Sequence, residues 1–238
     1  MKDRPPVEHK ATYLSKSQLF AGLPAEQMAE FERQTAMTTC ERGRVFFSPE
    51  DSPGTIYILK DGAVRLFRRD TEGRQLTVAI LDAGSVFGES ELLGQVHAGV
   101  YAEALDECLL CVVPTEQMRT LIRRYPDIGL NLLSHLGDRL RRSQELSEEM
   151  AYWSAEQRLA RHIELLAERF GRPSLTGGTI ISRPFTQAEI ASMIGATRQT
   201  VSELMGELTR AGTISMRRRR IIVRNRDALQ RLGQPRRP

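Results

Sequence analysis

Two short amphipathic segments joined by a single glycine constrain this chain more than any other stretch. The first segment, TQAEIASMI, opens with Thr186 and carries Glu189 three residues later, which is the spacing of a capping box at a helix start. Ile190 and Ile194 then recur on one face at helical spacing, and Gly195 follows directly. The pattern predicts a short helix with one buried face that stops at the glycine.

The second segment, TRQTVSELMGEL, predicts another helix, capped by the hydroxyl of Thr197. At roughly 100° per residue one sector collects the apolar side chains Val201, Leu204, Met205 and Leu208. The opposite side presents Gln199, Ser202, Glu203 and Gly206, with Arg198 at its edge. Two short helices joined by a tight turn containing glycine are typical of a helix-turn-helix, and an ordinary helical hairpin is the alternative.

The distribution of charge favours the helix-turn-helix. From Trp153 to the end there are 16 arginines, no lysine and seven acidic residues, a net charge of +9, which leaves −5 for residues 1–152. The run Arg217, Arg218, Arg219 and Arg220 lies between two β-type runs, residues 213–216 and 221–223. Although most arginine runs are solvated faces or tails, a hairpin with a basic tip beside such helices predicts a wing that contacts DNA phosphates.

The region before the basic half predicts a β-sandwich or jelly roll. Short β-type runs separated by turn residues fill about 95 residues, and Asp61-Gly62 and Glu72-Gly73 are hairpin signals. We therefore predict an α+β protein with a flexible N-terminus at 1–18, a jelly-roll sensor domain at 19–125, a dimerisation helix at 126–152 and a winged helix-turn-helix at 153–238. No signal peptide or membrane-length apolar run occurs, so the sequence predicts a cytoplasmic protein without membrane contact.

A long amphipathic helix follows the predicted sandwich. Its stripe, longer than one sandwich needs, holds Ile128, Leu132 or Leu133, Leu136 and Leu140. The spare apolar surface predicts a homodimer with Ile128, Leu132, Leu136 and Leu140 at the interface. A helix lying only on its own sandwich is the alternative.

Cysteines and histidines give no pattern for a metal site or for catalysis. Cys108 and Cys111 form a C-x-x-C within an apolar strand, where positions three apart point to opposite faces, so both are interpreted as small core or surface residues. The four histidines are scattered along the chain, unlike the clustered ligands of a metal-dependent jelly-roll enzyme. We therefore expect neither a metal site nor an enzyme.

The turn GSVFGE and the helix-turn-helix block resemble the cyclic-AMP receptor protein and FNR family of bacterial regulators, over about residues 19–228. The resemblance implies a homodimer that binds double-stranded DNA at a near-palindromic promoter site and contacts RNA polymerase. It implies base reading by Arg198, Gln199, Ser202 and Glu203. Phosphate contacts would come from Thr186, Thr197, Thr200 and the four wing arginines. In cyclic-AMP receptors a second arginine stands at the position of Glu203, so the half-site is expected to differ from TGTGA while Arg198 retains one guanine.

The same resemblance marks a ligand pocket formed by Phe87, Gly88, Glu89, Ser90, Ala98, Gly99, Ser143 and Gln144. Gly88 and Glu89 match the residues that hold the ribose in cyclic-AMP receptors. Ala98 and Gly99 replace the Arg-Ser pair that holds the phosphate, and a buried anion without donors is costly. The lone His97 is more typical of a surface residue than of a replacement. On the long helix, Ser143 matches one of two adenine-binding hydroxyls and Gln144 departs from the other.

These departures argue against cyclic AMP, and no cofactor is predicted. The iron-sulfur cysteine cluster of other members is absent, and the arginine that binds 2-oxoglutarate in the nitrogen regulators aligns near Ala98. The segment FGESELLGQVHAGVYAEA most resembles stress regulators of the Deinococcus and Thermus group, some of which act without an effector. The leading hypothesis is thus an effector-independent activator in a stress response. The alternatives are a regulator gated by cyclic AMP or another small molecule in the jelly roll, and a nucleotide-sensing module that regulates a protein partner.

Overall fold

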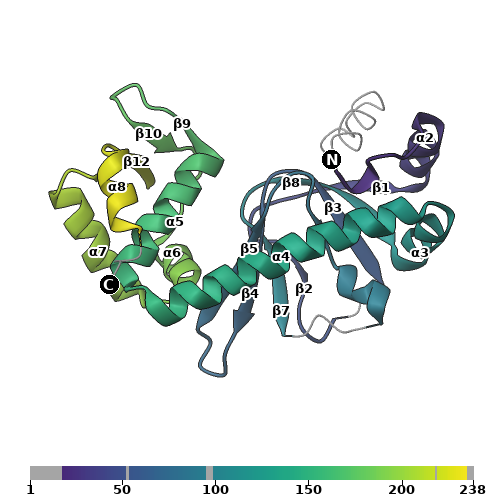
Figure 1. Ribbon diagram of the computed structural model, residues 1–238, viewed down its shortest axis with the longest axis horizontal. Helices are drawn as coiled ribbons and strands as arrows, with labels where there is room; N and C mark the ends of the chain where they lie inside the picture. Colours follow the sequence, from purple (N-terminus) through teal and green to yellow (C-terminus); the bar gives the residue numbers. More distant parts are fainter. Residues whose placement is uncertain (1–17, 52–53, 95–98, 218, 235–238) are drawn as a thin grey trace. The chain divides into compact units, whose positions relative to one another are not determined.

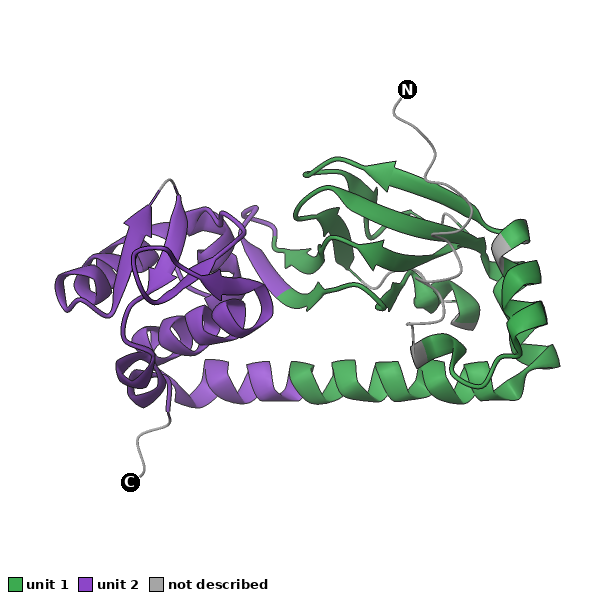
Figure 2. Ribbon diagram, turned by 90° about the horizontal axis from the view of Figure 1, so that it is seen from above, with its two compact units in different colours: residues 1–70, 78–143 green, residues 71–77, 144–238 purple. Residues whose placement is uncertain are grey.

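The computed structural model describes residues 18–51, 54–94, 99–217 and 219–234. The chain forms two compact units, residues 1–70 with 78–143 and residues 71–77 with 144–238 (Figure 2). The predicted flexible N-terminus, apart from Gln18, lies outside the described residues, as do His97, Ala98 and Arg218. Along the parts of the chain that are described, no helix is both long enough and apolar enough to cross a membrane.

Two four-stranded sheets build the first unit, as the alternating short strands predict (Figure 1). One sheet has the order β1 (Ala36–Cys40), β8 (Cys108–Pro114), β3 (Thr55–Asp61) and β6 (Val86–Phe87). The other has the order β2 (Val45–Phe47), β7 (Val100–Ala104), β4 (Val64–Arg69) and β5 (Gln75–Leu81). The turns predicted from Asp61-Gly62 and Glu72-Gly73 connect β3 to β4 and β4 to β5. Strand β1 was not predicted, because its sequence AMTTC lacks a regular alternation.

The strand β8 explains why the first unit has two apolar clusters. Cys108 and Leu110 face the cluster between the two sheets, together with Phe47, Leu59, Val64 and Phe87. Cys111 and Val113 point to the other side, where they pack with helical residues. The prediction that the two cysteines of the C-x-x-C point to opposite faces is therefore confirmed, since successive side chains of a strand alternate between faces.

Helical segments cover the second face of the β1–β8–β3–β6 sheet. They are η1 (Gln18–Phe20), α2 (Ala25–Gln34), α3 (Thr115–Arg124) and the start of α4 (Pro126–Tyr152), while the short η2 (Glu89–Leu93) follows β6. The cluster beneath them contains Leu19, Phe31, Ile58, Met118 and Ile128, all buried. The sandwich thus positions the turn after β6 and the first half of α4 against one another within the same unit.

The second unit combines helices with a small sheet. Its elements are α5 (Ala155–Phe170), β9 (Gly171–Pro173), β10 (Thr179–Ile181), α6 (Gln187–Ile194), α7 (Arg198–Arg210), β11 (Ile214–Arg217), β12 (Arg220–Val223) and α8 (Arg226–Leu232). The four strands are ordered β11, β12, β10 and β9. Helix α5 begins in a capping box between Ser154 and Gln157. Leu159, Ile163 and Val201 are fully buried, so α5 and α7 share one core.

Candidate functional site

The turn between α6 and α7 has the geometry that its sequence predicts. Thr186 and Glu189 form the expected capping box, with the Glu189 amide donating to the Thr186 hydroxyl at 3.1 Å. Thr197 caps α7 by accepting a hydrogen bond from the Thr200 amide, also at 3.1 Å. Gly195 adopts the left-handed conformation at φ 59°, and a Cβ there would lie 2.6 Å from the Met150 sulfur. A side chain at this turn would therefore be strained both by its backbone and by its contact.

Helix α7 presents its polar side chains to solvent. Val201, Met205 and Leu208 are buried, while Leu204 is only half-buried. The predicted base-reading residues Arg198, Gln199, Ser202 and Glu203 are all exposed. Two hydrogen bonds engage them: the Gln199 amide donates to Glu203 at 3.1 Å, and the Gln187 amide donates to Ser202 at a longer 3.4 Å. Glu203 therefore has a hydrogen-bond donor on its own helix, one turn earlier.

The hairpin β11–β12 carries the arginine run at its end. The strands extend one residue further into the run than predicted, so that Arg217 and Arg220 form the last cross-strand pair. Arg217, Arg219 and Arg220 are exposed, and Arg219 adopts a left-handed backbone with φ 64°. Like charges directly opposite one another on a hairpin repel. A polyanion placed against this end would relieve that repulsion.

The turn after β6 forms a second polar site, within the first unit. Gly88 is left-handed at φ 83°, and a Cβ there would lie 2.7 Å from the Thr55 carbonyl oxygen. Glu89 follows with 8% of its surface exposed. The Arg139 guanidinium of α4 donates to Glu89 Oε1 at 2.5 Å and to the Val86 carbonyl at 2.7 Å. The carboxylate that the resemblance assigns to a ligand is therefore already paired within the chain.

Arg139 was missed at the sequence level, although its spacing gave a signal. It stands seven residues after Leu132, which is buried, so both belong to the face of α4 that turns toward the sandwich. A charged residue on a buried helix face needs a partner. Glu89 Oε2, by contrast, is buried and has no hydrogen-bond partner among the described residues.

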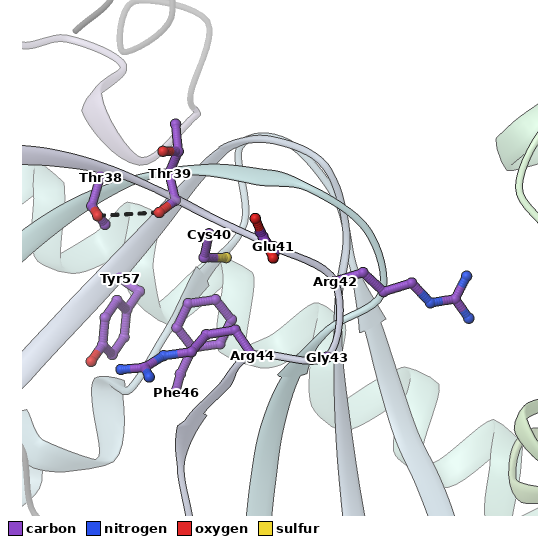
Figure 3. A pocket seen from close by; sticks show the side chains of 9 residues that line it. All are labelled: Thr38, Thr39, Cys40, Glu41, Arg42, Gly43, Arg44, Phe46 and Tyr57. Atoms are coloured by element: carbon purple, nitrogen blue, oxygen red, sulfur yellow. Dashed lines mark hydrogen bonds between the residues drawn. The ribbon is translucent and has the colours of Figure 1, made fainter. Parts of the chain in front are cut away.

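The remaining predicted pocket residues differ in their burial. Phe87 is buried in the core between the sheets and stacks on Tyr57 at a centroid distance of 5.0 Å, so it serves packing instead of lining a pocket. Ser90 is half-buried, and Gly99, Ser143 and Gln144 are exposed. Ala98 lies outside the described residues. A cavity of about 620 Å³ lies elsewhere, where the turn from β1 to β2 meets Phe46 and Tyr57 (Figure 3).

Helix α4 corrects part of the predicted dimer interface. Ile128 and Leu132 are 1% and 8% exposed, respectively, and both pack into the core of their own sandwich. They cannot also face a second chain, so assigning them to the interface was wrong. Leu136 is half-buried. Three leucines of α4 are exposed, namely Leu130, Leu133 and Leu140, each more than 60% accessible.

A buried histidine lies within the second unit. His162 Nδ1 is 3.1 Å from the Arg158 carbonyl oxygen and 3.9 Å from Glu149 Oε2. Burial lowers the pKa of His162 to about 4, and burial also raises the pKa of Glu149 above its ordinary value. Nothing in the sequence indicates that this histidine is buried. Among the described residues, no group of three or more His, Cys, Asp or Glu side chains could hold a metal ion.

Known proteins match both parts of this fold. A cyclic nucleotide-binding domain matches residues 37–125, and a Crp-like helix-turn-helix domain matches residues 157–232. The global nitrogen regulator of Synechococcus elongatus is 37% identical over 191 residues, which cover 79% of this chain and 86% of that protein. The CRP-like cAMP-activated global transcriptional regulator of Mycobacterium tuberculosis is 26% identical over 219 residues, or 92% and 97% of the two chains.

Solved structures agree with these matches. A transcriptional regulator of the CRP/FNR family from Thermus thermophilus superposes with a TM-score of 0.71 at 26% identity, covering 83% of this chain and 98% of that one. The fold and its two matched domains define a DNA-binding transcriptional regulator. The chain belongs to the CRP/FNR family of such regulators.

Proposed function

We propose that this regulator is a homodimer that binds a near-palindromic promoter site without requiring cyclic AMP. The carrying observation is the ion pair between Glu89 and Arg139, with 2.5 Å between Glu89 Oε1 and Arg139 Nη1. An acidic group that is buried and paired within the chain needs no ligand to compensate its charge. The substitution of Ala98 and Gly99 for the family's phosphate-binding pair supports the same proposal.

The alternative, gating by a small molecule, is favoured by the second oxygen of the same carboxylate. Glu89 Oε2 is buried without a hydrogen-bond partner in the described parts of the chain, and leaving a buried acceptor unpaired costs about 1–3 kcal/mol. A ligand hydroxyl would satisfy it. The ion pair engages only one of the two carboxylate oxygens of Glu89, which leaves the other for a ligand. The two candidate functions therefore predict different results for a titration with cyclic AMP.

Binding to promoter DNA, measured by fluorescence anisotropy with and without cyclic AMP, separates the two functions. Effector independence predicts nanomolar-range binding by the ligand-free protein and a change of less than about tenfold on adding cyclic AMP, about 1.4 kcal/mol. A strong, saturable increase in affinity at micromolar cyclic AMP would overturn the proposal. Isothermal calorimetry of the same samples identifies ligand binding that leaves DNA affinity unchanged.

The proposed dimer forms through the exposed leucines of α4. Leu133 and Leu140 are 64% and 61% exposed and stand seven residues apart, the spacing of one coiled-coil position. Replacing Leu140 by glutamate would place a charge at this seam and should shift the sedimenting species from dimer to monomer at micromolar concentration. The matched change Arg142→Glu, at an exposed residue two positions further on and therefore on the opposite face of the helix, should leave the dimer intact. A wild-type monomer under these conditions would refute the assignment.

Base reading is proposed for Arg198, Gln199, Ser202 and Glu203, and phosphate binding for Thr186, Thr197, Thr200 and the arginines 217–220. Arg198 suits guanine O6 and N7, and Glu203 can accept a hydrogen bond from cytosine N4. Selection of sites from random DNA should give a half-site with one guanine that departs from TGTGA, and Glu203→Arg should change the selected bases. Identical selected sites for both proteins would show that Glu203 reads nothing.

The remaining parts of the proposal follow from this regulator class. A transcription factor that works without a ligand is controlled by its own abundance, which suits an activator in a stress response that acts in the cytoplasm through RNA polymerase. Run-off transcription with purified polymerase on the selected site tests activation directly. The protein should raise transcript yield when the site lies upstream of the promoter.

A further inference from the structure

Two cysteines that lie 68 positions apart in the sequence stand directly opposite one another in the sandwich. Cys40 ends β1 and Cys108 begins β8, and they form the last pair of the antiparallel β1–β8 register. Residues directly opposite in such a pair have Cα atoms about 4.5 or 5.5 Å apart. A disulfide requires a Cα separation of about 4.4–6.8 Å, so either kind of pair meets this requirement.

The two thiols differ in access. Cys40 is half-buried and lines the cavity of about 620 Å³, where Figure 3 shows its sulfur directed into the space beside Phe46 and Arg44. Cys108 is buried beneath it. Its Sγ donates toward the Ala63 carbonyl at 3.4 Å and lies 3.8 Å from Asp106 Oδ1.

We propose that Cys40 and Cys108 form an oxidisable dithiol that peroxides convert to a disulfide between β1 and β8. The Cys40 thiolate attacks one peroxide oxygen, the O–O bond breaks, and a sulfenic acid and hydroxide form. Cys108 then attacks the Cys40 sulfur, the S–S bond forms, and the S–O bond breaks to release water with the thiol proton. The net reaction oxidises two thiols and reduces one peroxide to two waters.

The third cysteine cannot take the place of either. Cys111 packs in the cluster beneath the helices, on the other side of the sheet from Cys108. The C-x-x-C of the sequence therefore has no dithiol geometry, and the partner of Cys108 comes from the opposite strand. Gly62 packs directly against Cys108, since a Cβ on it would lie 2.8 Å from the Cys108 sulfur.

The surroundings make this a slow thiol pair at neutral pH. Burial raises the pKa of Cys40 and raises that of Cys108 to about 12. The charged groups that act on Cys40 are Arg44, which favours its thiolate, and Asp106, which opposes it; Asp106 also acts on Cys108. Because the thiolate is the nucleophile, the oxidation rate should rise about tenfold per pH unit from pH 7 to 8. Sustained exposure to peroxide would therefore oxidise the pair to the disulfide, whereas brief exposure would leave both thiols reduced.

The test is a peptide map of the reduced full-length protein after exposure to hydrogen peroxide. Trypsin cleaves after Arg33 and Arg42, so Cys40 lies in peptide 34–42, while Cys108 lies in peptide 75–119. Without reductant, the two peptides should appear joined by a disulfide, and fragmentation should assign the bond to Cys108. Cys40→Ser should yield no joined peptide, and protein unfolded in urea should yield mixed pairings.

Other products would overturn the proposal. A Cys108–Cys111 disulfide, a Cys40 sulfinic acid without the joined peptide, or an unchanged Cys40 thiol at peroxide doses that oxidise the methionines would each do so. A rate that does not change between pH 7 and 8 would refute attack by a thiolate. The map of the wild-type protein is decisive by itself, even if a variant fails to fold.

Discussion

Glu89 and Glu203 are carboxylates in opposite surroundings. Glu89 is 8% exposed and ion-paired to Arg139, whereas Glu203 stands on the exposed face of α7 with a single hydrogen bond from the Gln199 amide. In the first unit a charge has its partner inside the chain. On α7 and the β11–β12 hairpin, the charges remain available for a partner outside it. Substitutions at the first kind of charge should therefore change folding, and those at the second should change binding.

The largest effect is expected for Arg139→Ala. The change leaves Glu89 buried without its cation, and breaking a buried pair on one side costs roughly 3 kcal/mol. Urea unfolding should show that loss, while Arg141→Ala, which breaks the exposed pair with Asp138, should change the unfolding free energy by less than about 0.5 kcal/mol. Adding Glu89→Gln to Arg139→Ala should recover part of the stability. A loss no larger than that of Arg141→Ala would show that the pair is not an internal anchor.

The buried His162 is expected to have the next largest effect, and only in acid. Its folded pKa of about 4 lies below the ordinary 6.5, so the unfolded chain takes up a proton first and stability falls as the pH drops from 6.5 toward 4. At pH 5 the loss is about 2 kcal/mol. Glu149, whose pKa is raised, acts in the opposite sense because protonation favours its folded form.

Denaturation of wild type and His162→Gln at pH 7 and pH 5 isolates this contribution. The wild type should lose more stability between the two values than the variant, by about 2 kcal/mol. Equal losses of stability would mean that folded His162 takes up its proton at pH 5 as readily as it does in the unfolded chain.

Arg198→Ala should leave unfolding unchanged and reduce specific DNA binding by roughly 1.5 kcal/mol per half-site, which lies within the range of about 1–3 kcal/mol for one bidentate base contact. Arg198→Lys is the matched control, since it retains the charge but loses the planar pair of donors. If the lysine variant discriminates sites as well as the wild type does, Arg198 contacts phosphate only.

The smallest effect is expected at the wing. Replacing Arg217 or Arg220 by alanine should lower the dependence of log K on log salt by about one unit each, equally for specific and non-specific DNA. Arg231→Ala, an exposed arginine of α8, removes the same charge and should leave the slope unchanged. Wing variants that alter site preference instead would show that the hairpin reads bases.

The helix-turn-helix could be predicted from sequence because its determinants are local. The Thr186 and Thr197 caps, the glycine turn and the buried stripe all lie within a few residues of the groups that they fix. The register of α4 could not be predicted in the same way. Its first half carries apolar residues on more than one face, and only the packing of the sandwich decides that Ile128 turns inward and Leu130 outward.

The pairs that join distant strands and helices were likewise beyond local reasoning. Glu89 and Arg139 lie 50 positions apart, and Cys40 meets Cys108 only because β1 pairs with β8 in one particular register. The sequence did identify Glu89 as a site residue through its resemblance to a family. It carried no information on which residue of the chain would form an ion pair with that carboxylate, because a single sequence does not reveal tertiary pairs.

The left-handed Arg219 bears on any attempt to engineer this protein. Its φ of 64° would suit glycine, and an ordinary side chain in this region costs about 1–2 kcal/mol. The wing thus carries a residue that charge complementarity favours and backbone sterics oppose. Arg219→Gly should make the free protein more heat-resistant while lowering its affinity for DNA. Selection for thermostability alone would therefore weaken DNA binding by this regulator.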